Sequence, residues 1–167
     1  MGSHQQEELF LTVIEQHKGI IYKIARSFKK DEDDKNDLVQ EIIFQLWRAF
    51  PGFDERSRLS TWMYRVALNV AITSYRKEQK KNKLIVCWPE SLMDFKADEE
   101  PDGANLNLLQ QFINELRELD RALMLLYLEE KSGKEMAEIL GLSEANIRTK
   151  INRIKEQLKL RFSKINN

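Results

Sequence analysis

The sequence predicts an all-α protein made of two small helical domains with an acidic linker between them. Apolar residues recur every three or four positions along most of the chain, which is the spacing of amphipathic helices. Only 6 glycines and 3 prolines occur among the 167 residues, so few residues break these helices. Residues 84–105 lack a helical period and contain two of the prolines. We therefore expect domains over residues 8–83 and 106–163, joined by a flexible linker over 84–105.

The first predicted helix carries an apolar stripe that extends from Phe10 to Phe28. His17 lies beside that stripe. It fits a residue at the edge of a core better than a metal ligand, because no second ligand is nearby in the sequence. The N-terminal domain should therefore begin with a helix that packs through one face.

Two further helices are predicted in the same domain. After a polar connection, Asp37 takes an N-cap position with Gln40 three residues later, which is the spacing of a capping box. The helix that follows, 38–50, should end at Pro51-Gly52. A loop then leads to a third helix, which Ser60 can cap and which should extend to about residue 82.

The C-terminal domain should begin near Leu106 with a helix whose apolar face extends to Leu119, followed by a helix over 120–130. Ser132 or Gly133 can open a short third helix. The last helix should carry the apolar stripe of Ile147, Ile151, Ile154, Leu158 and Phe162.

Charge is segregated along the chain although the formal net charge is zero. Basic residues dominate 58–83 and the region after Ser143, whereas acidic residues dominate 90–102. Two basic segments separated by an acidic one indicate a nucleic-acid partner more clearly than the total charge does. The basic residues of the first segment are Arg58, Arg65, Arg76, Lys77, Lys80, Lys81 and Lys83.

Composition also restricts the cellular setting. Cys87 is the only cysteine, so no intrachain disulfide can form, which suits a reducing cytoplasm. No apolar run approaches the ~20 residues that a membrane-spanning helix needs, and no export signal opens the chain. We expect a cytoplasmic protein that does not insert into the membrane, with no metal and no cofactor.

A helix-turn-helix pattern occupies residues 134–148. Ala137 is small where the two helices would cross, Gly141 can adopt the positive φ that ends the first helix, and Ser143 can cap the second. The opposite face of the second helix could enter a major groove, where arginine and asparagine pair with base edges. That face consists of Asn146, Arg148, Thr149, Lys150 and Arg153.

The helix that begins at Ser60 carries a different signal. Trp62, Arg65 and Asn69 fall on one side, apart from an apolar stripe, and Arg76 extends this side toward the lysines. Aromatic rings stack on unpaired bases and cations hold the phosphates, so this side suits a single strand. A tryptophan at helical spacing is more often a core residue, and that alternative stays open here.

Two parts of the sequence resemble conserved regions of a known family. The segment Asp37-Leu38-Val39-Gln40-Glu41 and the segment from Ser60 to Asn69 closely resemble the second conserved region of extracytoplasmic-function (ECF) sigma factors. Residues 116–158, which include the helix-turn-helix, resemble their fourth region. Arg117 stands where many relatives have proline, and Gly133 where many have an aromatic residue.

The resemblance implies a dissociable subunit of bacterial RNA polymerase that directs promoter-specific initiation and has no catalysis of its own. It implies contacts with the clamp coiled coil of the largest catalytic subunit and the flap of the second largest, and regulation by an anti-sigma factor. The candidate polymerase contacts are Asp37, Gln40, Glu41 and Gln45.

The resemblance also assigns the two basic surfaces to promoter DNA. The melted minus-ten strand would be held by Phe53, Arg58, Ser60, Thr61, Trp62, Arg65, Asn69 and Arg76. The helix-turn-helix residues Asn146, Arg148, Thr149, Lys150 and Arg153 would read the minus-thirty-five duplex.

Two other classes of function remain. A duplex-binding helix-turn-helix regulator with an N-terminal dimerisation or sensor module would need no strand-holding surface, so Trp62 and Asn69 would be packing residues. A nuclease would need a carboxylate cluster with metal-ligand spacing, and the sequence has none. Asp54 and Glu55 would be its first candidates.

Overall fold

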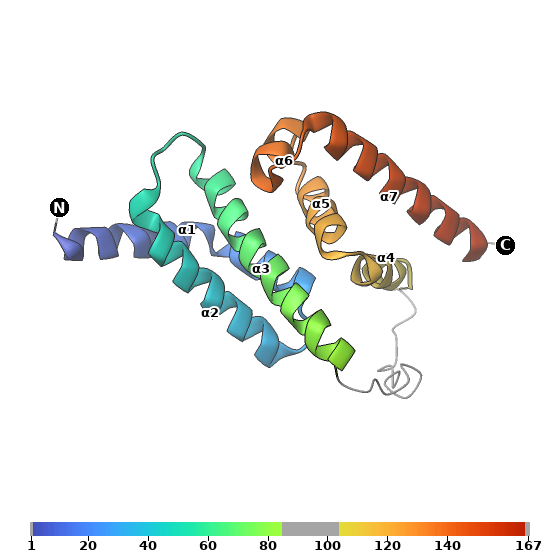
Figure 1. Cartoon of the computed structure of the whole chain (residues 1–167), viewed down its shortest axis with the longest axis horizontal. Helices are drawn as coiled ribbons and strands as arrows, with labels where there is room; N and C mark the ends of the chain where they lie inside the picture. The colour runs from blue at the N-terminus through green and yellow to red at the C-terminus, as the bar shows by residue number, and fades with distance from the viewer. Residues whose placement is uncertain (1, 85–103, 166–167) are drawn as a thin grey trace.

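The computed structural model describes residues 2–84 and 104–165, and within them all regular structure is helical (Figure 1). The predicted all-α class is therefore confirmed. The elements in chain order are α1 (Ser3–Phe28), α2 (Glu32–Ala49), the 3-10 helix η1 (Phe50–Gly52), α3 (Leu59–Leu84), α4 (Ala104–Glu115), α5 (Glu118–Leu128), α6 (Gly133–Leu140) and α7 (Glu144–Ile165).

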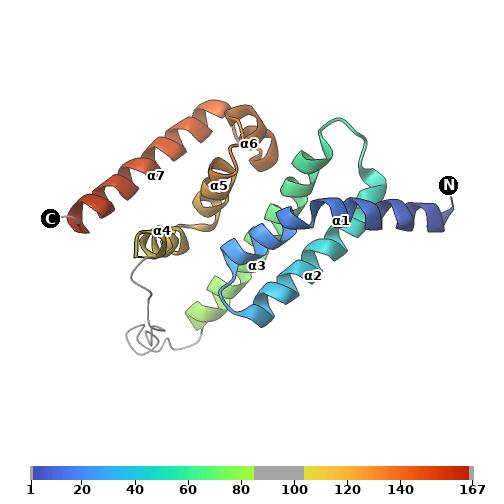
Figure 2. The same ribbon diagram turned by 180° about the vertical axis from the view of Figure 1, so that it is seen from behind.

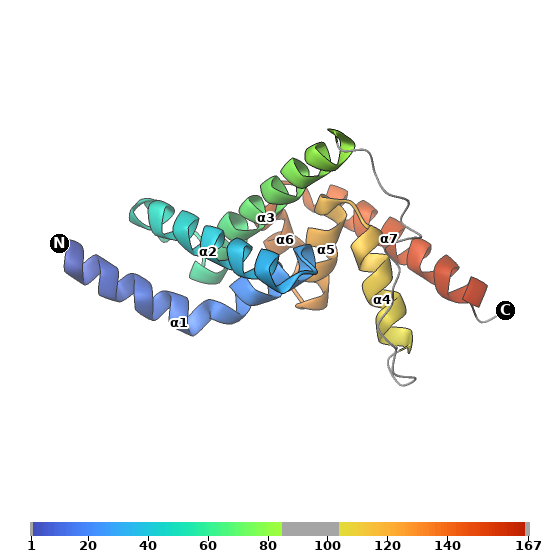
Figure 3. The same ribbon diagram turned by 90° about the horizontal axis from the view of Figure 1, so that it is seen from below.

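Helices α1 to α3 form an N-terminal unit in which each helix packs against the other two. Its core includes fully buried side chains that the helical periodicity had placed on one face of each helix, among them Ile24, Ile42, Leu46, Met63 and Ala67. Figure 3 shows that the N-terminal part of α1 extends beyond α2 and α3. The helix bends at His17, whose φ and ψ of −119° and 15° are non-helical.

The start of α2 differs from the prediction. The helix begins at Glu32, and Asp31 is the N-cap, whose carboxylate accepts a hydrogen bond from the backbone N–H of Asp34. Asp37 therefore lies inside α2, as part of an exposed face. Three acidic residues in the first turn favour this earlier start because negative charge is stabilising at the positive end of a helix dipole.

Helices α4 to α7 form a C-terminal unit. Helix α4 ends at Glu115 and α5 begins at Glu118, with Leu116-Arg117 between them. The predicted apolar face from Leu106 to Leu119 therefore belongs to two helices rather than one. Helix α7 packs across α5 and α6, and Ile147, Ile151 and Ile154 are its buried residues. The spacing of these three isoleucines had predicted this buried stripe.

The two units lie side by side. Helix α3 packs against α5 and α6, and α1 packs against α5. Figures 1 and 2 show α7 on the far side of the C-terminal unit from α3. Both ends of the predicted linker 84–105 are helical, because α3 includes Leu84 and α4 starts at Ala104. The rest of that prediction, with Pro89 and the acidic cluster, lies outside the described residues.

Candidate nucleic-acid interface

The helix-turn-helix has the local geometry that its sequence predicts. Ser132 caps α6 in a capping box with Glu135, with hydrogen bonds of 3.0 and 3.1 Å. Gly141 ends α6 with φ of 69°, in the left-handed region that glycine adopts without strain. The hydroxyl of Ser143 accepts a 3.1 Å hydrogen bond from the N–H of Asn146 at the start of α7. The turn is therefore fixed by the left-handed backbone of Gly141 at its first end and by the hydroxyl of Ser143 at its second.

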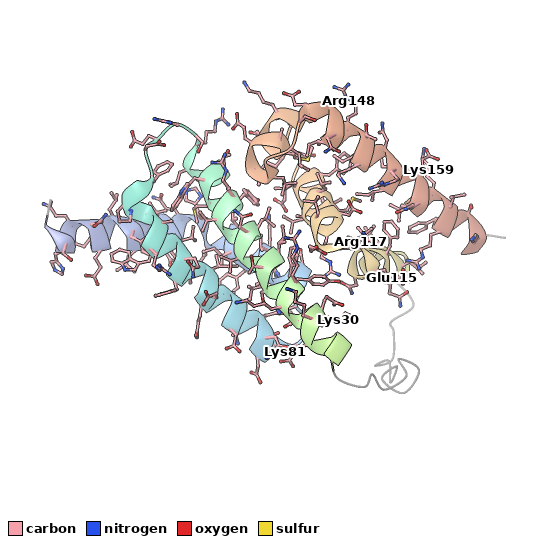
Figure 4. The ribbon with its side chains drawn as sticks, in the orientation of Figure 1. Lys30, Lys81, Glu115, Arg117, Arg148 and Lys159 are labelled. Carbon is pink, nitrogen blue, oxygen red and sulfur yellow. The ribbon has the colours of Figure 1, made fainter. Side chains whose placement is uncertain are left out.

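The outer face of α7 carries the predicted duplex-reading residues. Asn146, Arg148, Thr149 and Arg153 are exposed and Lys150 is half-buried, which leaves their polar groups on one accessible surface. Figure 4 shows Arg148 near the start of α7, on the side that faces away from α3. The hydroxyl of Thr149 donates to the carbonyl of Ala145 within the helix.

Trp62 lies between packing and exposure. It is half-buried, with its ring centroid 5.1 Å from that of Phe53 and 6.2 Å from that of Phe50. Phe50 in turn contacts Phe10 of α1 at 5.4 Å. These contacts fix the orientation of the indole from beneath, while the remaining part of the ring is accessible. The packing interpretation thus holds for part of the Trp62 ring, and its contact with unpaired bases stays a prediction.

The neighbours of Trp62 differ in exposure. Asn69 is exposed and Ser60 is half-buried. Thr61 is 5% exposed, so its side chain faces the core and is not accessible to a strand in this arrangement. Thr61 lies on the buried side of α3, together with Met63 and Tyr64.

The three arginines of the proposed strand-holding surface contact the C-terminal unit. Arg65 donates through Nε and Nη2 to the carbonyl of Glu138, at 3.2 and 2.8 Å. Arg76 donates to the carboxylate of Glu118 at 2.9 Å. The guanidinium of Arg58 lies 3.9 Å from the carboxylate of Glu135. Sequence patterns did not predict these partners because they are 42 to 77 positions away.

The pKa of Glu118 lies below its ordinary value, chiefly because of the hydrogen bond from Arg76. This carboxylate is therefore better stabilised as an anion while the two units are in contact. Its contribution to their packing is present above the ordinary pKa and is lost as the pH falls through the lowered one.

Helix α2 presents the candidate polymerase contacts. Asp37, Gln40 and Glu41 are exposed, and the side-chain amide of the half-buried Gln45 donates to the carboxylate of Glu41 at 3.0 Å. Positions three, four and eight residues apart share one helical face, so the four side chains form a continuous polar surface.

Arg121 is the functional candidate that sequence reasoning missed. It is 5% exposed although it is charged, and it lies in α5 where the two units meet. A signal was present, because Arg121 precedes the run Ala122 to Leu126 and shares a helical face with the apolar Met124 and Leu125.

Residues 2–84 and 104–165 contain neither a candidate metal site nor a candidate membrane-spanning helix. No group of three or more His, Cys, Asp or Glu side chains is placed to hold a metal ion there. No helix in these ranges is long and apolar enough to cross a membrane.

Comparisons with known proteins agree with this architecture. Residues 13–81 match the family described as Sigma-70 region 2, and residues 106–158 match Sigma-70, region 4. The chain belongs to the extracytoplasmic-function (ECF) sigma factors. Among its relatives are two from Bacillus subtilis. RNA polymerase sigma factor SigV is 25% identical, covering 93% of this chain and 92% of SigV. ECF RNA polymerase sigma factor SigW is 28% identical, covering 92% of this chain and 88% of SigW.

Solved structures share the fold of this sigma factor. CnrH in complex with the cytosolic domain of CnrY superposes with a TM-score of 0.68 at 22% identity, covering 94% of this chain and 89% of that one. The sigma factor RpoE of Bartonella quintana, in complex with the anti-sigma factor NepR, gives 0.67 at 19% identity, covering 94% and 96%. The function of this ECF sigma factor is thus promoter-specific transcription initiation with RNA polymerase. The comparisons favour this function over a duplex-binding regulator and over a nuclease.

Proposed function

We propose that this ECF sigma factor captures the melted minus-ten strand on α3 and reads the minus-thirty-five duplex with α7, without catalysis of its own. The observation that carries this proposal is the pair of accessible polar surfaces on separate helical units. One surface combines a partly exposed indole with Asn69 and arginines, and the other is the outer face of a capped recognition helix. Stacking on the indole suits unpaired bases, whereas the outer face of α7 suits a major groove.

The chemistry of the α3 surface favours strand capture over strand separation. Stacking of a base on an aromatic ring contributes about 1–3 kcal/mol, and unstacking a base step costs a few kcal/mol, about the same order. The sigma factor can therefore stabilise bases that are already flipped out, but it needs further binding energy to open the duplex. That energy would come from the polymerase holoenzyme.

Core polymerase would dock on the polar face of α2 formed by Asp37, Gln40, Glu41 and Gln45, through the clamp coiled coil of its largest subunit. We assign polymerase docking and strand capture to the N-terminal unit, and duplex reading to the C-terminal unit. The site of action is the cytoplasm, where bacterial polymerase transcribes, and an anti-sigma factor is the expected regulator, as for the relative solved with NepR.

The experiment that tests the proposal compares open complexes formed with wild type, Asn69→Ala and Trp62→Ala. Both variants should reduce permanganate reactivity of minus-ten thymines by about tenfold, the equivalent of one lost base contact, while binding to core polymerase stays intact. Because Trp62 also packs on Phe53, the Asn69 variant separates a loss of contact from a loss of packing.

The matched control is Gln16→Ala, which removes an exposed side-chain amide from α1. It should leave the footprint unchanged. Full melting with both Asn69→Ala and Trp62→Ala would show that α3 does not hold the strand.

A further inference from the structure

The side of α3 that the proposed function assigns to DNA continues beyond Arg76. Lys80 follows Arg76 by four residues and Asn69 by eleven, and both separations return to the same side of a helix. The Lys80 side chain is exposed, and within residues 2–84 and 104–165 it has no ion pair or hydrogen bond. Its ammonium is therefore available to a DNA phosphate.

Two more lysines lie beside Lys80. Lys77 and Lys81 are about one turn apart on α3, both are exposed, and neither has a side-chain partner in the described part of the chain. The exposed Lys30, just after α1, lies toward the same end of the N-terminal unit as Lys81 (Figure 4). Ammonium groups gathered in this way suit the backbone of DNA, because each lysine that neutralises a phosphate releases condensed counterions.

Glu78 is the only acidic residue between Arg58 and Lys83. It lies directly after Lys77 and three positions before Lys81, and residues three apart are neighbours on a helix surface. A carboxylate without another partner at this position would attract the ammonium of Lys81 and occupy it. DNA would then lose one cation at this end of α3.

A lysine from another helix pairs with Glu78 instead. The ammonium of Lys29, at the end of α1, donates to the carboxylate of Glu78. The Lys29 side chain is 7% exposed, whereas that of Glu78 is 46% exposed. A lysine is almost never buried to this degree unless it is paired. Because less water screens a buried ammonium, it attracts the carboxylate more strongly than the exposed Lys81 does.

Two contacts fix the position of Lys29. Its backbone N–H donates to the carbonyl of Ala25 at 3.0 Å and caps α1. The ring of Phe28, the preceding residue, packs edge-on against that of Tyr75, with centroids 6.4 Å apart. Tyr75 lies on α3 about one turn before Glu78. The end of α1 is thus held where the Lys29 side chain reaches Glu78.

We propose that Lys29 is a positioning residue for promoter binding, which takes up the carboxylate of Glu78 and so keeps the lysines at the end of α3 available to DNA phosphates. This proposal rests on the proposed function of α3, because it requires promoter DNA to lie along that helix. Lys29 is too buried to contact DNA, so its effect on affinity passes through Glu78. The pair acts by removing a competing anion from the surface.

The test measures how the polymerase holoenzyme binds a fluorescent fork-junction promoter fragment over a range of salt concentrations. Lys29→Met removes the ammonium and keeps a long unbranched side chain. Glu78 is then free to pair with Lys81, so the slope of log affinity against log salt should decrease by about 0.7–0.9, the equivalent of one phosphate contact. Affinity at physiological salt should fall about fivefold.

The double variant Lys29→Met with Glu78→Gln separates this role from a structural one. An amide has no charge to hold a lysine, so both the affinity and the salt slope should return to the wild-type values. A structural role of the ion pair gives the opposite result, because the double variant lacks the pair as fully as the single variant does. Glu78→Gln alone is avoided, since it leaves the buried ammonium of Lys29 without its partner.

A second variant pair identifies the lysine that Glu78 would occupy. Lys81→Ala should lower the salt slope in the wild type, and it should cause little further change in the Lys29→Met background, where Glu78 already holds Lys81. Lys18→Met is the matched control, because it removes an ammonium from the same helix and breaks a 2.9 Å pair with Glu15 away from α3. It should change neither the affinity nor the slope.

An unchanged salt slope in Lys29→Met would overturn the proposal. A loss of affinity that Glu78→Gln does not restore would also overturn it, because Lys29 would then act through the fold. In both cases Lys80→Ala should still lower the slope, since Lys80 lies on the DNA-binding side itself. Failure of the proposed function would give a different pattern, in which Lys80→Ala also leaves the slope unchanged and Asn69→Ala leaves melting intact.

Discussion

Tyr64 lies on α3 at the junction of the two units, with 3% of its surface exposed. Burial raises the pKa of Tyr64 to about 12, and the nearby charge of Glu129 acts in the same direction. The hydroxyl thus stays protonated in the folded chain at pH values where an exposed tyrosine loses its proton. This difference links the stability of the chain to alkaline pH.

The sign of the effect follows from proton binding. Between about pH 10 and 12 the unfolded chain has lost the Tyr64 proton and the folded chain has kept it, so the free energy of unfolding falls as the pH rises. The full difference corresponds to roughly 2–3 kcal/mol. Tyr64→Phe keeps the ring and removes the ionisation, so urea titrations at pH 9 and 11.5 should show a smaller alkaline loss for the variant. Parallel losses in both proteins would contradict this.

Single residues also show what sequence reasoning can and cannot supply. Gly141 and Ser143 were predicted with their roles, and Ser132 as one of two residues that could open α6, because capping and left-handed turns depend on neighbours within four positions. The contacts of Arg65 and Arg121 were not predicted, because they join residues up to 94 positions apart. No local pattern encodes a partner so far away in the sequence. For Arg121, the only local sign of burial was its place directly before the apolar run Ala122 to Leu126.

At the scale of elements, α2 shows a limit of capping signals. Asp31 and Asp37 both precede a helical pattern with a polar residue three positions later, so both are acceptable N-caps by local rules. The structure uses Asp31, which adds six residues to the start of the helix and brings the acidic first-turn residues Glu32, Asp33 and Asp34 to its positive end. The existence and the face of α2 were predicted correctly, and its start was wrong.

The polar face of α2 leads to a prediction for assembly. Glu41→Lys reverses a charge at the centre of the face formed by Asp37, Gln40 and Gln45, and it removes the hydrogen bond from Gln45. A like charge placed against a docking partner costs several kcal/mol, so affinity for core polymerase should fall at least tenfold. Stability should change by no more than about 0.5 kcal/mol, because the position is exposed.

Co-purification and a competition assay against wild type measure this affinity. Glu15→Lys on α1 is the control, since it makes the same charge change on a helix outside the proposed contact, and it should bind core polymerase normally. Normal binding of the Glu41 variant would remove this face of α2 from the polymerase interface.

For the whole molecule, the arrangement of the units separates the two proposed DNA-binding surfaces. The proposed strand-holding residues Arg65 and Arg76 contact the C-terminal unit, whereas α7 lies on the far side of that unit from α3 (Figure 1). Exposed ion pairs such as Arg76–Glu118 contribute about 0–1 kcal/mol each. Of the hydrogen bonds of the buried Arg121, only the 3.5 Å bond to the carbonyl of Ser27 joins the two units, and its guanidinium also lies over the rings of Phe28 and Tyr75 in the N-terminal unit.

The proposed duplex-binding surface on α7 gives a prediction for salt dependence. Arg153 is exposed on the outer face of α7, where it can neutralise one phosphate. Arg153→Ala should weaken binding to a minus-thirty-five duplex and reduce the slope of log affinity against log salt by about 0.9. Lys159→Ala is the control, because Lys159 lies further along α7 and pairs with Glu156 at 3.6 Å (Figure 4).

Salt titrations of fluorescence anisotropy measure both slopes, and an unaltered slope for Arg153→Ala would place that residue outside the duplex interface.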